Sequence, residues 1–247
     1  MMQTLAIIPA RGGSKGIPLK NIQKLADRSL IEYTILASKK SKEIDKIIVS
    51  TDNDKIAKIS QSLGAEVPFL RPKKLSNDNA SIFKVINHTL DFLFKTQSYE
   101  PDIILLLQPT SPLRTTKMID ESISILKKSK ATCVLAVTKI KTHPYSSFWY
   151  DKHYLVPFKS NFQKYFQRQK HPDLYYPTGS IYTFWSETLK KYNSIYGPKI
   201  KPMIINDEYA IDVDSKFDLF VAEMKILHWK GYNKRFQKYK KSTQNYF

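Results

Sequence analysis

The sequence predicts an α/β protein built around a doubly wound, mostly parallel sheet. Short runs rich in isoleucine, leucine and valine alternate along the chain with longer segments whose apolar residues recur at helical spacing. A glycine-rich loop directly follows the first apolar run, which is typical of sheets that bind ligands beyond the carboxyl ends of their strands. The 247 residues, 42% of them hydrophobic, are enough to bury one substantial core.

Each expected element can be assigned to a range of residues. The expected strands cover residues 5–10, 46–51, 66–70, 102–108, 132–138, 179–185 and 201–206. The expected helices cover residues 29–40, 53–63, 79–95, 116–128 and 215–230. The run at 102–108 is the most apolar of the strands, so we expect it in the centre of the sheet.

From residue 140 to 177 this alternation breaks down. Aromatic residues, prolines and basic residues are mixed there without a regular period, as in THPYSSFWYDKHYLVPF at 142–158. We expect an excursion from the sheet that serves as a lid or as a dimerisation arm. Residues 1–230 are expected to form a single domain, and the basic, aromatic segment 231–247 a frayed C-terminal tail.

The formal net charge of +18 raises the hypothesis of a nucleic-acid-binding protein. Two features of the basic residues weaken this hypothesis. Only six of the 40 are arginines, which proteins use for bidentate contacts to bases, and the lysines are spread over the whole chain. We therefore expect solvated lysine faces that also attract small anions, and no nucleic-acid partner.

Other classes of protein are disfavoured as well. No apolar run approaches the roughly 18 residues of a membrane span, so no membrane partner is expected. The N-terminal segment has neither a basic region nor a small-residue cleavage site, which argues against a signal peptide. Cys133 is the only cysteine and lies in an apolar run, so we expect a buried thiol and no disulfide. Together these features predict a cytoplasmic location.

The loop at 11–21, RGGSKGIPLKN, has the composition of a phosphate-binding site. Glycines let the backbone approach a ligand and direct its N–H groups toward it, and cations neutralise phosphate charge. The loop matches neither the P-loop GxxxxGK[ST] nor the dinucleotide fingerprint GxGxxG. Its glycines, cations and polar side chains are Gly12, Gly13, Gly16, Arg11, Lys15, Lys20, Ser14 and Asn21.

A pair of carboxylates near the end of the chain has the spacing of a metal site. Asp212 and Asp214 stand two residues apart, which places both on one face of an extended segment. Two such carboxylates hold Mg²⁺ when phosphate and water complete its shell. The alternative is that Asp214 caps the helix expected from residue 215, and both roles remain open for this residue.

At this point the chain resembles a known family. The loop RGGSKGIPLKN is similar to the signature of the acylneuraminate cytidylyltransferases. Four further segments resemble the family in the same order, at 71–81, 108–114, 168–182 and 210–214, so that the resemblance covers most of residues 3–220. It implies a Rossmann-like, three-layer α/β/α nucleotidyltransferase fold with a small dimerisation arm at about 140–177, and therefore a homodimer.

The resemblance also implies a role for each residue of the site. The implied nucleotide contacts are Arg11, Gly12, Gly13, Ser14, Lys20, Asn21, Arg71 and Ser81. The implied sugar contacts are Gln108, Arg168 and Tyr182, and the implied Mg²⁺ ligands are Asp212 and Asp214. Arg11 and Lys20 are in addition the implied catalytic residues, because they would stabilise the charge on the reacting phosphates.

The implied reaction is a Mg²⁺-dependent transfer of CMP from CTP to a 2-keto-3-deoxy nonulosonic (sialic-type) acid, with release of pyrophosphate. The alternatives are a CMP-Kdo synthetase or another sugar nucleotidylyltransferase, and a basic nucleic-acid-binding protein. On the sugar side the chain departs from the family pattern: Thr178 stands where the family often has asparagine, and Tyr176 where it often has arginine. The identity of the sugar acid therefore stays open.

Overall fold

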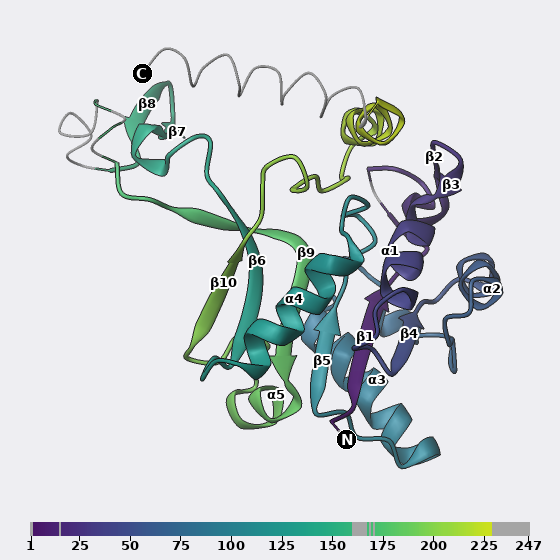
Figure 1. The fold of residues 1–247 in the computed structure, drawn as a ribbon. Helices are drawn as coiled ribbons and strands as arrows, with labels where there is room; N and C mark the ends of the chain where they lie inside the picture. The colour runs from purple at the N-terminus through teal and green to yellow at the C-terminus, as the bar shows by residue number, and fades with distance from the viewer. Residues whose placement is uncertain (1, 15, 160–166, 168, 170, 229–247) are drawn as a thin grey trace, which may run out of the picture.

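The computed structural model describes residues 2–14, 16–159, 167, 169 and 171–228, arranged around one central sheet (Figure 1). The six strands are β1 (Thr4–Pro9), β4 (Lys46–Ser50), β5 (Ile103–Leu106), β6 (Cys133–Lys139), β9 (Tyr175–Trp185) and β10 (Ile200–Ile204), in the spatial order β10-β6-β9-β5-β1-β4. β9 runs antiparallel to β5 and β6, whereas every other neighbouring pair is parallel. The mostly parallel sheet predicted from the sequence is confirmed.

Helices cover both faces of the sheet and complete a three-layer α/β/α structure (Figure 1). One face is covered by α1 (Leu30–Lys39), α2 (Asp54–Ser62) and α4 (Thr116–Lys127), and the other by α3 (Ile82–Gln97) and α5 (Ser186–Tyr192). Polar side chains cap the N-termini of two of these helices. The side chain of Asn53 accepts hydrogen bonds from two backbone N–H groups of α2, and Thr115 accepts one from α4.

The most apolar predicted strand does lie in the interior of the sheet. All four residues of β5 are at most 1% exposed, and the strand pairs with β1 on one side and β9 on the other. Helices pack against both of its faces, which explains its uninterrupted apolar run. Cys133 of β6 is also fully buried and has a free thiol, as expected.

The strand predicted at 66–70 is wrong. This segment makes only isolated bridges to β4 and its extension, from Glu66 to Ile48 and from Leu70 to Thr51. Pro68 stands between the two bridges and has no N–H to donate, so a continuous ladder cannot form across it. Three backbone hydrogen bonds remain: Glu66 N–H donates to the Ile47 carbonyl, Val49 N–H donates to the Glu66 carbonyl, and Arg71 N–H donates to the Thr51 carbonyl.

The segment expected to leave the sheet contains a separate hairpin. Its short helix η3 (Pro144–Ser146) is followed by β7 (Phe148–Asp151) and β8 (Tyr154–Pro157), which pair with each other in a two-stranded sheet. The hairpin extends beyond the ends of β6 and β9 (Figure 1). The chain is already back in the sheet at Tyr175, inside the range expected for the excursion. The division into a domain of residues 1–230 and a tail stays a prediction, and 231–247 lie outside the described residues.

Smaller elements surround the glycine-rich loop. They are η1 (Lys20–Ile22), β2 (Lys24–Leu25), β3 (Arg28–Ser29) and, further along the chain, η2 (Lys73–Leu75). Residues 216–228 are helical, in line with the last expected helix. Ala222 of this helix belongs to a small apolar cluster with Ile17, Leu25 and Val213, so the end of the described chain packs against the loop near its beginning. Within the described ranges, no helix has the length and apolar character that crossing a membrane requires.

Candidate functional site

A cavity of about 470 Å³ opens beyond the carboxyl ends of β1 and β5. We call it the main cavity. Its walls come from the glycine-rich loop, from residues 71–85, from residues 108–110 and from the extended segment at 212–214. Eight residues predicted from the sequence line it together: Arg11, Ser14, Lys20, Asn21, Arg71, Gln108, Asp212 and Asp214.

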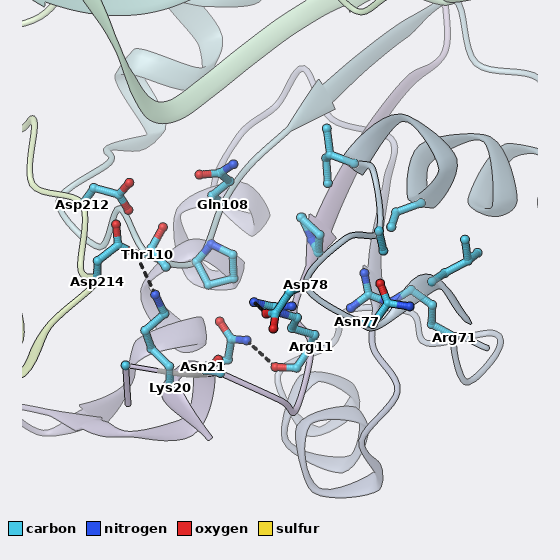
Figure 2. A pocket seen from close by; sticks show the side chains of 18 residues that line it. Arg11, Lys20, Asn21, Arg71, Asn77, Asp78, Gln108, Thr110, Asp212 and Asp214 are labelled. Atoms are coloured by element: carbon cyan, nitrogen blue, oxygen red, sulfur yellow. Dashed lines mark hydrogen bonds and ion pairs between the residues drawn. The ribbon is translucent and has the colours of Figure 1, made fainter. Parts of the chain in front are cut away.

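Charged side chains line the main cavity along its length. Figure 2 shows Asp212 and Asp214 on one side, with Lys20 reaching toward them, and Arg11 and Arg71 on the opposite side. The Lys20 ammonium donates a hydrogen bond to Asp214 Oδ1 over 2.9 Å. An elongated ligand that carries several negative charges would meet cations along the whole length of this cavity.

The glycine-rich loop is held by contacts within the protein. The N–H of Gly12 donates to Asp52 Oδ1 at 2.8 Å, and the Asn21 amide donates to the carbonyl of Arg11 at 2.9 Å. A Cβ atom on Gly16 would lie only 2.6 Å from the carbonyl oxygen of Asp214. Gly16 therefore permits a close approach between the loop and the carboxylate segment, a use of glycine that the sequence did not reveal.

Arg11 is paired inside the cavity with a residue that was not predicted. Its guanidinium lies 2.8 Å from Asp78 Oδ1, and both side chains are partly exposed. Asp78 and its neighbour Asn77 both line the main cavity. They belong to the segment 71–81 that carries part of the family resemblance, which was the available signal for them.

Arg71 is buried with donors that find no acceptor among the described residues. The residue is 6% exposed, and neither its Nε nor its Nη2 has a hydrogen-bond partner in the part of the chain that the structure describes. Burial lowers the pKa of its guanidinium, and Asp52 partly opposes this shift. Buried donors are almost always paired in folded proteins. The unpaired Arg71 donors in the wall of a cavity therefore indicate a ligand that carries acceptor atoms.

The two carboxylates occupy different environments. Burial raises the pKa of Asp212, as does the charge of Asp214, while a hydrogen bond with Thr110 and the charge of Lys20 lower it. Asp214 is 75% exposed in its side chain. The N–H of Val213 between them donates to the Thr110 carbonyl at 2.8 Å, so the loop after β5 fixes the position of this segment.

The alternative role of Asp214 as a helix cap is wrong. Ser215 Oγ accepts the N–H of Asp218 at 3.2 Å, and Asp218 Oδ2 accepts the N–H of Ser215 at 2.8 Å. This reciprocal pair is a capping box with Ser215 as its first residue. The carboxylate of Asp214 therefore remains available to the main cavity, where Lys20 holds it.

Gly179 sits where three parts of the site converge. Its φ of +73° favours glycine, and a Cβ atom there would lie 2.9 Å from Gln108 Oε1 and 3.5 Å from Asp212 Oδ2. Any side chain at this position would thus press on a predicted sugar contact and on a predicted metal ligand. The sequence alone does not single out Gly179, although this residue lies in a segment that resembles the family.

Buried Arg114 holds together three segments next to the main cavity. It is 4% exposed and donates to the Ser180 carbonyl at 2.6 Å, to Thr34 Oγ1 at 2.8 Å and to the carbonyl of Gln108. Burial lowers the pKa of Arg114 to about 9, and the nearby charge of Asp212 opposes this shift. One buried cation thus joins β9, α1 and the loop that carries Gln108.

The remaining predicted residues lie outside the main cavity wall. Gly12 and Gly13 belong to the loop but do not line the cavity, and Ser81 stands between the lining residues Ala80 and Ile82. Tyr182 is 9% exposed in an apolar cluster of the sheet, where burial raises its pKa to about 12. Lys15 and Arg168 fall outside the described residues.

Comparisons with known proteins agree with one another. The family model described as Cytidylyltransferase matches residues 5–242. The chain is 35% identical to the CMP-N,N'-diacetyllegionaminic acid synthase of Legionella pneumophila, over 90% of this chain and 95% of that protein. It is 28% identical to a pseudaminic acid cytidylyltransferase of Campylobacter jejuni, over 90% and 96% of the two chains.

A solved structure supports the fold. The structure of CMP:2-keto-3-deoxy-manno-octonic acid synthetase complexed with CTP superposes with a TM-score of 0.67 and covers 92% of this chain and 99% of that one. The two sequences are 14% identical. The shared feature at this distance is the fold.

Proposed function

The chain belongs to the cytidylyltransferase family, and from this premise we propose that it transfers CMP from CTP to a nonulosonic acid, releasing pyrophosphate. The resemblance read from the glycine-rich loop is thereby confirmed at the level of the family, which makes the protein a nucleotidyltransferase. The exact reaction, its metal and its acceptor are the parts that we propose.

The observation that carries the nucleotide assignment is the pair of unpartnered donors on buried Arg71. The O2 and N3 atoms of cytosine are acceptors that guanidinium donors satisfy. In this arrangement the base lies beside Arg71, the ribose leads to an α-phosphate near Asp212, Asp214 and Lys20, and the β- and γ-phosphates lie along the glycine-rich loop with Arg11. Arg11 exchanges its contact with Asp78 for phosphate oxygens.

The donor set on the acidic side suits Mg²⁺. Asp212 and Asp214 provide hard oxygen ligands, and no group of three His, Cys, Asp or Glu side chains in the described ranges has the geometry to hold a metal. Sites with one or two carboxylates that are completed by substrate phosphates are characteristic of Mg²⁺. Bound there, the ion would neutralise charge that develops on the phosphate oxygens during transfer.

The chain's own residues would act by positioning and by charge. The anomeric hydroxyl oxygen of the acid forms a bond to the α-phosphorus, the bond to the β-phosphate oxygen breaks, and the hydroxyl proton passes to solvent. Lys20 and Arg11 donate hydrogen bonds to the phosphate oxygens on which charge accumulates. Gln108 orients the acid beside Asp212, and Arg168 stays a predicted carboxylate contact outside the described residues.

We also propose a homodimer formed through the β7–β8 hairpin. All of the hairpin's large apolar side chains face solvent, and Tyr150, Tyr154 and Leu155 are 76%, 77% and 66% exposed. Exposed apolar patches of this kind mark interaction sites. Light scattering after size exclusion should give a dimer mass, and Leu155→Lys should shift it toward the monomer. A cytoplasmic location stays a prediction of the sequence.

The decisive experiment measures pyrophosphate release with Mg²⁺, each nucleoside triphosphate and a panel of 2-keto-3-deoxy acids. Release with CTP and a nine-carbon acid supports the proposal, whereas preference for the eight-carbon acid identifies a CMP-Kdo synthetase. In the same assay Arg71→Met should raise KM for CTP at least tenfold. An unchanged KM for this variant contradicts the placement of the base, and tight, salt-sensitive RNA binding without turnover favours the nucleic-acid alternative.

A further inference from the structure

The short segment after β4, residues 51–53, contacts two walls of the main cavity without lining it. One wall is the glycine-rich loop, and the other begins at Arg71. Backbone hydrogen bonds attach both walls to the end of this strand. Ala10 N–H donates to the Ser50 carbonyl at 2.9 Å, and Arg71 N–H donates to the Thr51 carbonyl at 2.7 Å. One short stretch of chain therefore sets the separation of the two walls.

Asp52 provides the side-chain contact to the glycine-rich loop. Its Oδ1 accepts the N–H of Gly12 over 2.8 Å, and a hydrogen bond to a charged acceptor is stronger than one between neutral groups. The next residue also stays close to the loop, because a Cβ atom on Gly12 would lie 2.9 Å from Cβ of Asn53. Asn53 in turn accepts two N–H groups at the start of α2. The helix start thus fixes the residues against which the loop packs.

Asp52 also provides a charge that balances buried Arg71. Burial lowers the pKa of the Arg71 guanidinium, the charge of Asp52 opposes this shift, and the charge of Arg11 adds to it. An uncompensated buried cation is costly, so a nearby carboxylate favours the buried position of this side chain. Neither Nε nor Nη2 of Arg71 donates to Asp52 or to any other described residue. Asp52 therefore stabilises the cation while these donors stay available to a ligand.

We propose that Asp52 is a positioning residue for CTP, which holds the phosphate loop through Gly12 and keeps Arg71 in its buried position through charge. This inference rests on the proposed cytidylyl transfer. Asp52 does not line the main cavity, so it acts through Gly12 and Arg71 and does not touch the nucleotide. The phosphate contacts and the base contact then depend on one carboxylate outside the cavity.

Two substitutions separate the two roles. Asp52→Asn keeps an oxygen that can accept from Gly12 but removes the charge, whereas Asp52→Ala removes both. Without the charge Arg71 should leave its buried position part of the time, and apparent affinity falls with the fraction of protein that is competent to bind. Calorimetric titration with CTP and Mg²⁺ should therefore give a Kd about threefold to tenfold higher in Asp52→Asn. Asp52→Ala should raise Kd a further threefold or so, because the loop loses its contact as well.

The direction of the Asp52→Asn effect is informative, because CTP is an anion. If Asp52 acted on CTP directly through its electric field, removal of this negative charge would tighten binding. The inference expects weaker binding, because the loss acts through the position of Arg71.

A double-mutant cycle with Arg71→Met tests this path. In the Arg71→Met background, Asp52→Asn should leave the Kd for CTP within twofold, since the cation that Asp52 balances is gone. Asp52→Ala should still raise Kd about threefold there, through the loop.

Asp54→Asn is the matched control. Asp54 is an exposed residue in the first turn of α2, two positions from Asp52, and it does not line the main cavity. This variant makes the same change in charge and should keep the Kd for CTP within twofold of wild type. Circular dichroism and thermal melts show whether each variant folds. Should Asp52→Ala fail to fold, Asp52→Asn and its cycle decide the inference.

Three outcomes would overturn the inference. They are unchanged or tighter binding of CTP by Asp52→Asn, an equal effect of Asp52→Asn with and without Arg71, and the same Kd for folded Asp52→Asn and Asp52→Ala. Calorimetry needs no acceptor, so these outcomes do not depend on turnover. A wild type that binds CTP but transfers CMP to no acid refutes the proposed reaction alone, and one that does not bind CTP refutes both.

Discussion

Lys20 and Asp214 stand 194 positions apart in the chain, yet the ammonium of one donates to the carboxylate of the other over 2.9 Å. The contact connects the proposed phosphate cation to a proposed metal ligand across the mouth of the main cavity (Figure 2). Under the proposed function, the two side chains would in addition contact the phosphates of CTP and Mg²⁺. The pair therefore keeps both charges in position before the substrate arrives.

Replacing Lys20 by Met should separate catalysis from stability. The lost donor normally faces charge that develops during transfer, so we expect kcat to fall by a factor of about 10² to 10³. The ion pair is exposed on its Asp214 side, so the free energy of unfolding should change by less than about 1 kcal/mol. Steady-state kinetics and urea denaturation measure the two effects. Lys24→Met, at the exposed position of strand β2, is the control, and a kcat within a few-fold of wild type for Lys20→Met would contradict its role.

Gly179→Ala should impair the site through crowding. Its positive φ disfavours alanine, and a methyl group there would displace Gln108 Oε1, which lies 2.9 Å from the Cβ position, so the variant should lose about 1 kcal/mol of stability or more and most of its activity. Gly197→Ala is a matched control, because Gly197 has a φ of +60° and a Cβ there would meet Thr132, which does not line the main cavity. Thermal melts should show similar losses for the two variants, and turnover assays a loss for Gly179→Ala alone. Similar activity in the two would show that crowding at Gln108 is harmless.

Removing the Arg114 side chain should leave several acceptors unsatisfied. Arg114→Met takes away the donors to Ser180, Thr34 and Gln108, and each buried group left unpaired costs about 1–3 kcal/mol. We expect a stability loss of about 3 kcal/mol or more in urea denaturation. Arg114→Lys keeps the charge near Asp212 and should recover part of kcat without recovering all of the stability. A stable, fully active Arg114→Met variant would refute this supporting role.

The thiol of Cys133 should respond to pH in a defined direction. Burial raises its pKa from 9.0 to about 12, so the thiol in the folded protein stays protonated while the thiol in the unfolded chain ionises. The stabilisation is complete below about pH 9 and is lost as the pH rises toward 12, at up to about 1.4 kcal/mol per pH unit. Urea titrations between pH 8 and 10 should show this extra slope for wild type and not for Cys133→Ala. At pH 8 the folded protein should react with a thiol reagent only through unfolding, and rapid reaction of the native protein would disprove the burial.

The main sheet could be predicted because its strands are buried and therefore appear in the sequence as runs of apolar residues. The direction of β9 could not be predicted in this way, since an antiparallel strand with helices on both sides has the same composition as a parallel one. Pro68 did carry the signal against a strand at 66–70, but the apolar residues around it outweighed that signal. The error illustrates that one missing donor can decide whether a short ladder forms.

The candidate site was predictable where residue type and chemistry coincide. Arg71, Lys20 and Asp212 do lie around one cavity, because glycine loops and strand ends meet at one edge of such sheets. Gly179 and Asp78 were missed because their importance comes from residues distant in sequence. The capping box of Ser215 and Asp218, in contrast, could be predicted from the S-x-x-D pattern of the sequence. This pattern assigns the helix cap to Ser215 and so argues against Asp214 as the cap.

The apolar cluster that joins Ile17 to Val213 and Ala222 has a consequence for how the protein becomes active. A ribosome makes the glycine-rich loop long before the carboxylate segment, and the cluster that fixes their separation needs both. The central sheet can assemble while the phosphate loop still lacks the helix against which it packs. The proposed activity therefore requires synthesis to pass this helix, and a chain released before residue 212 would carry the loop but neither carboxylate.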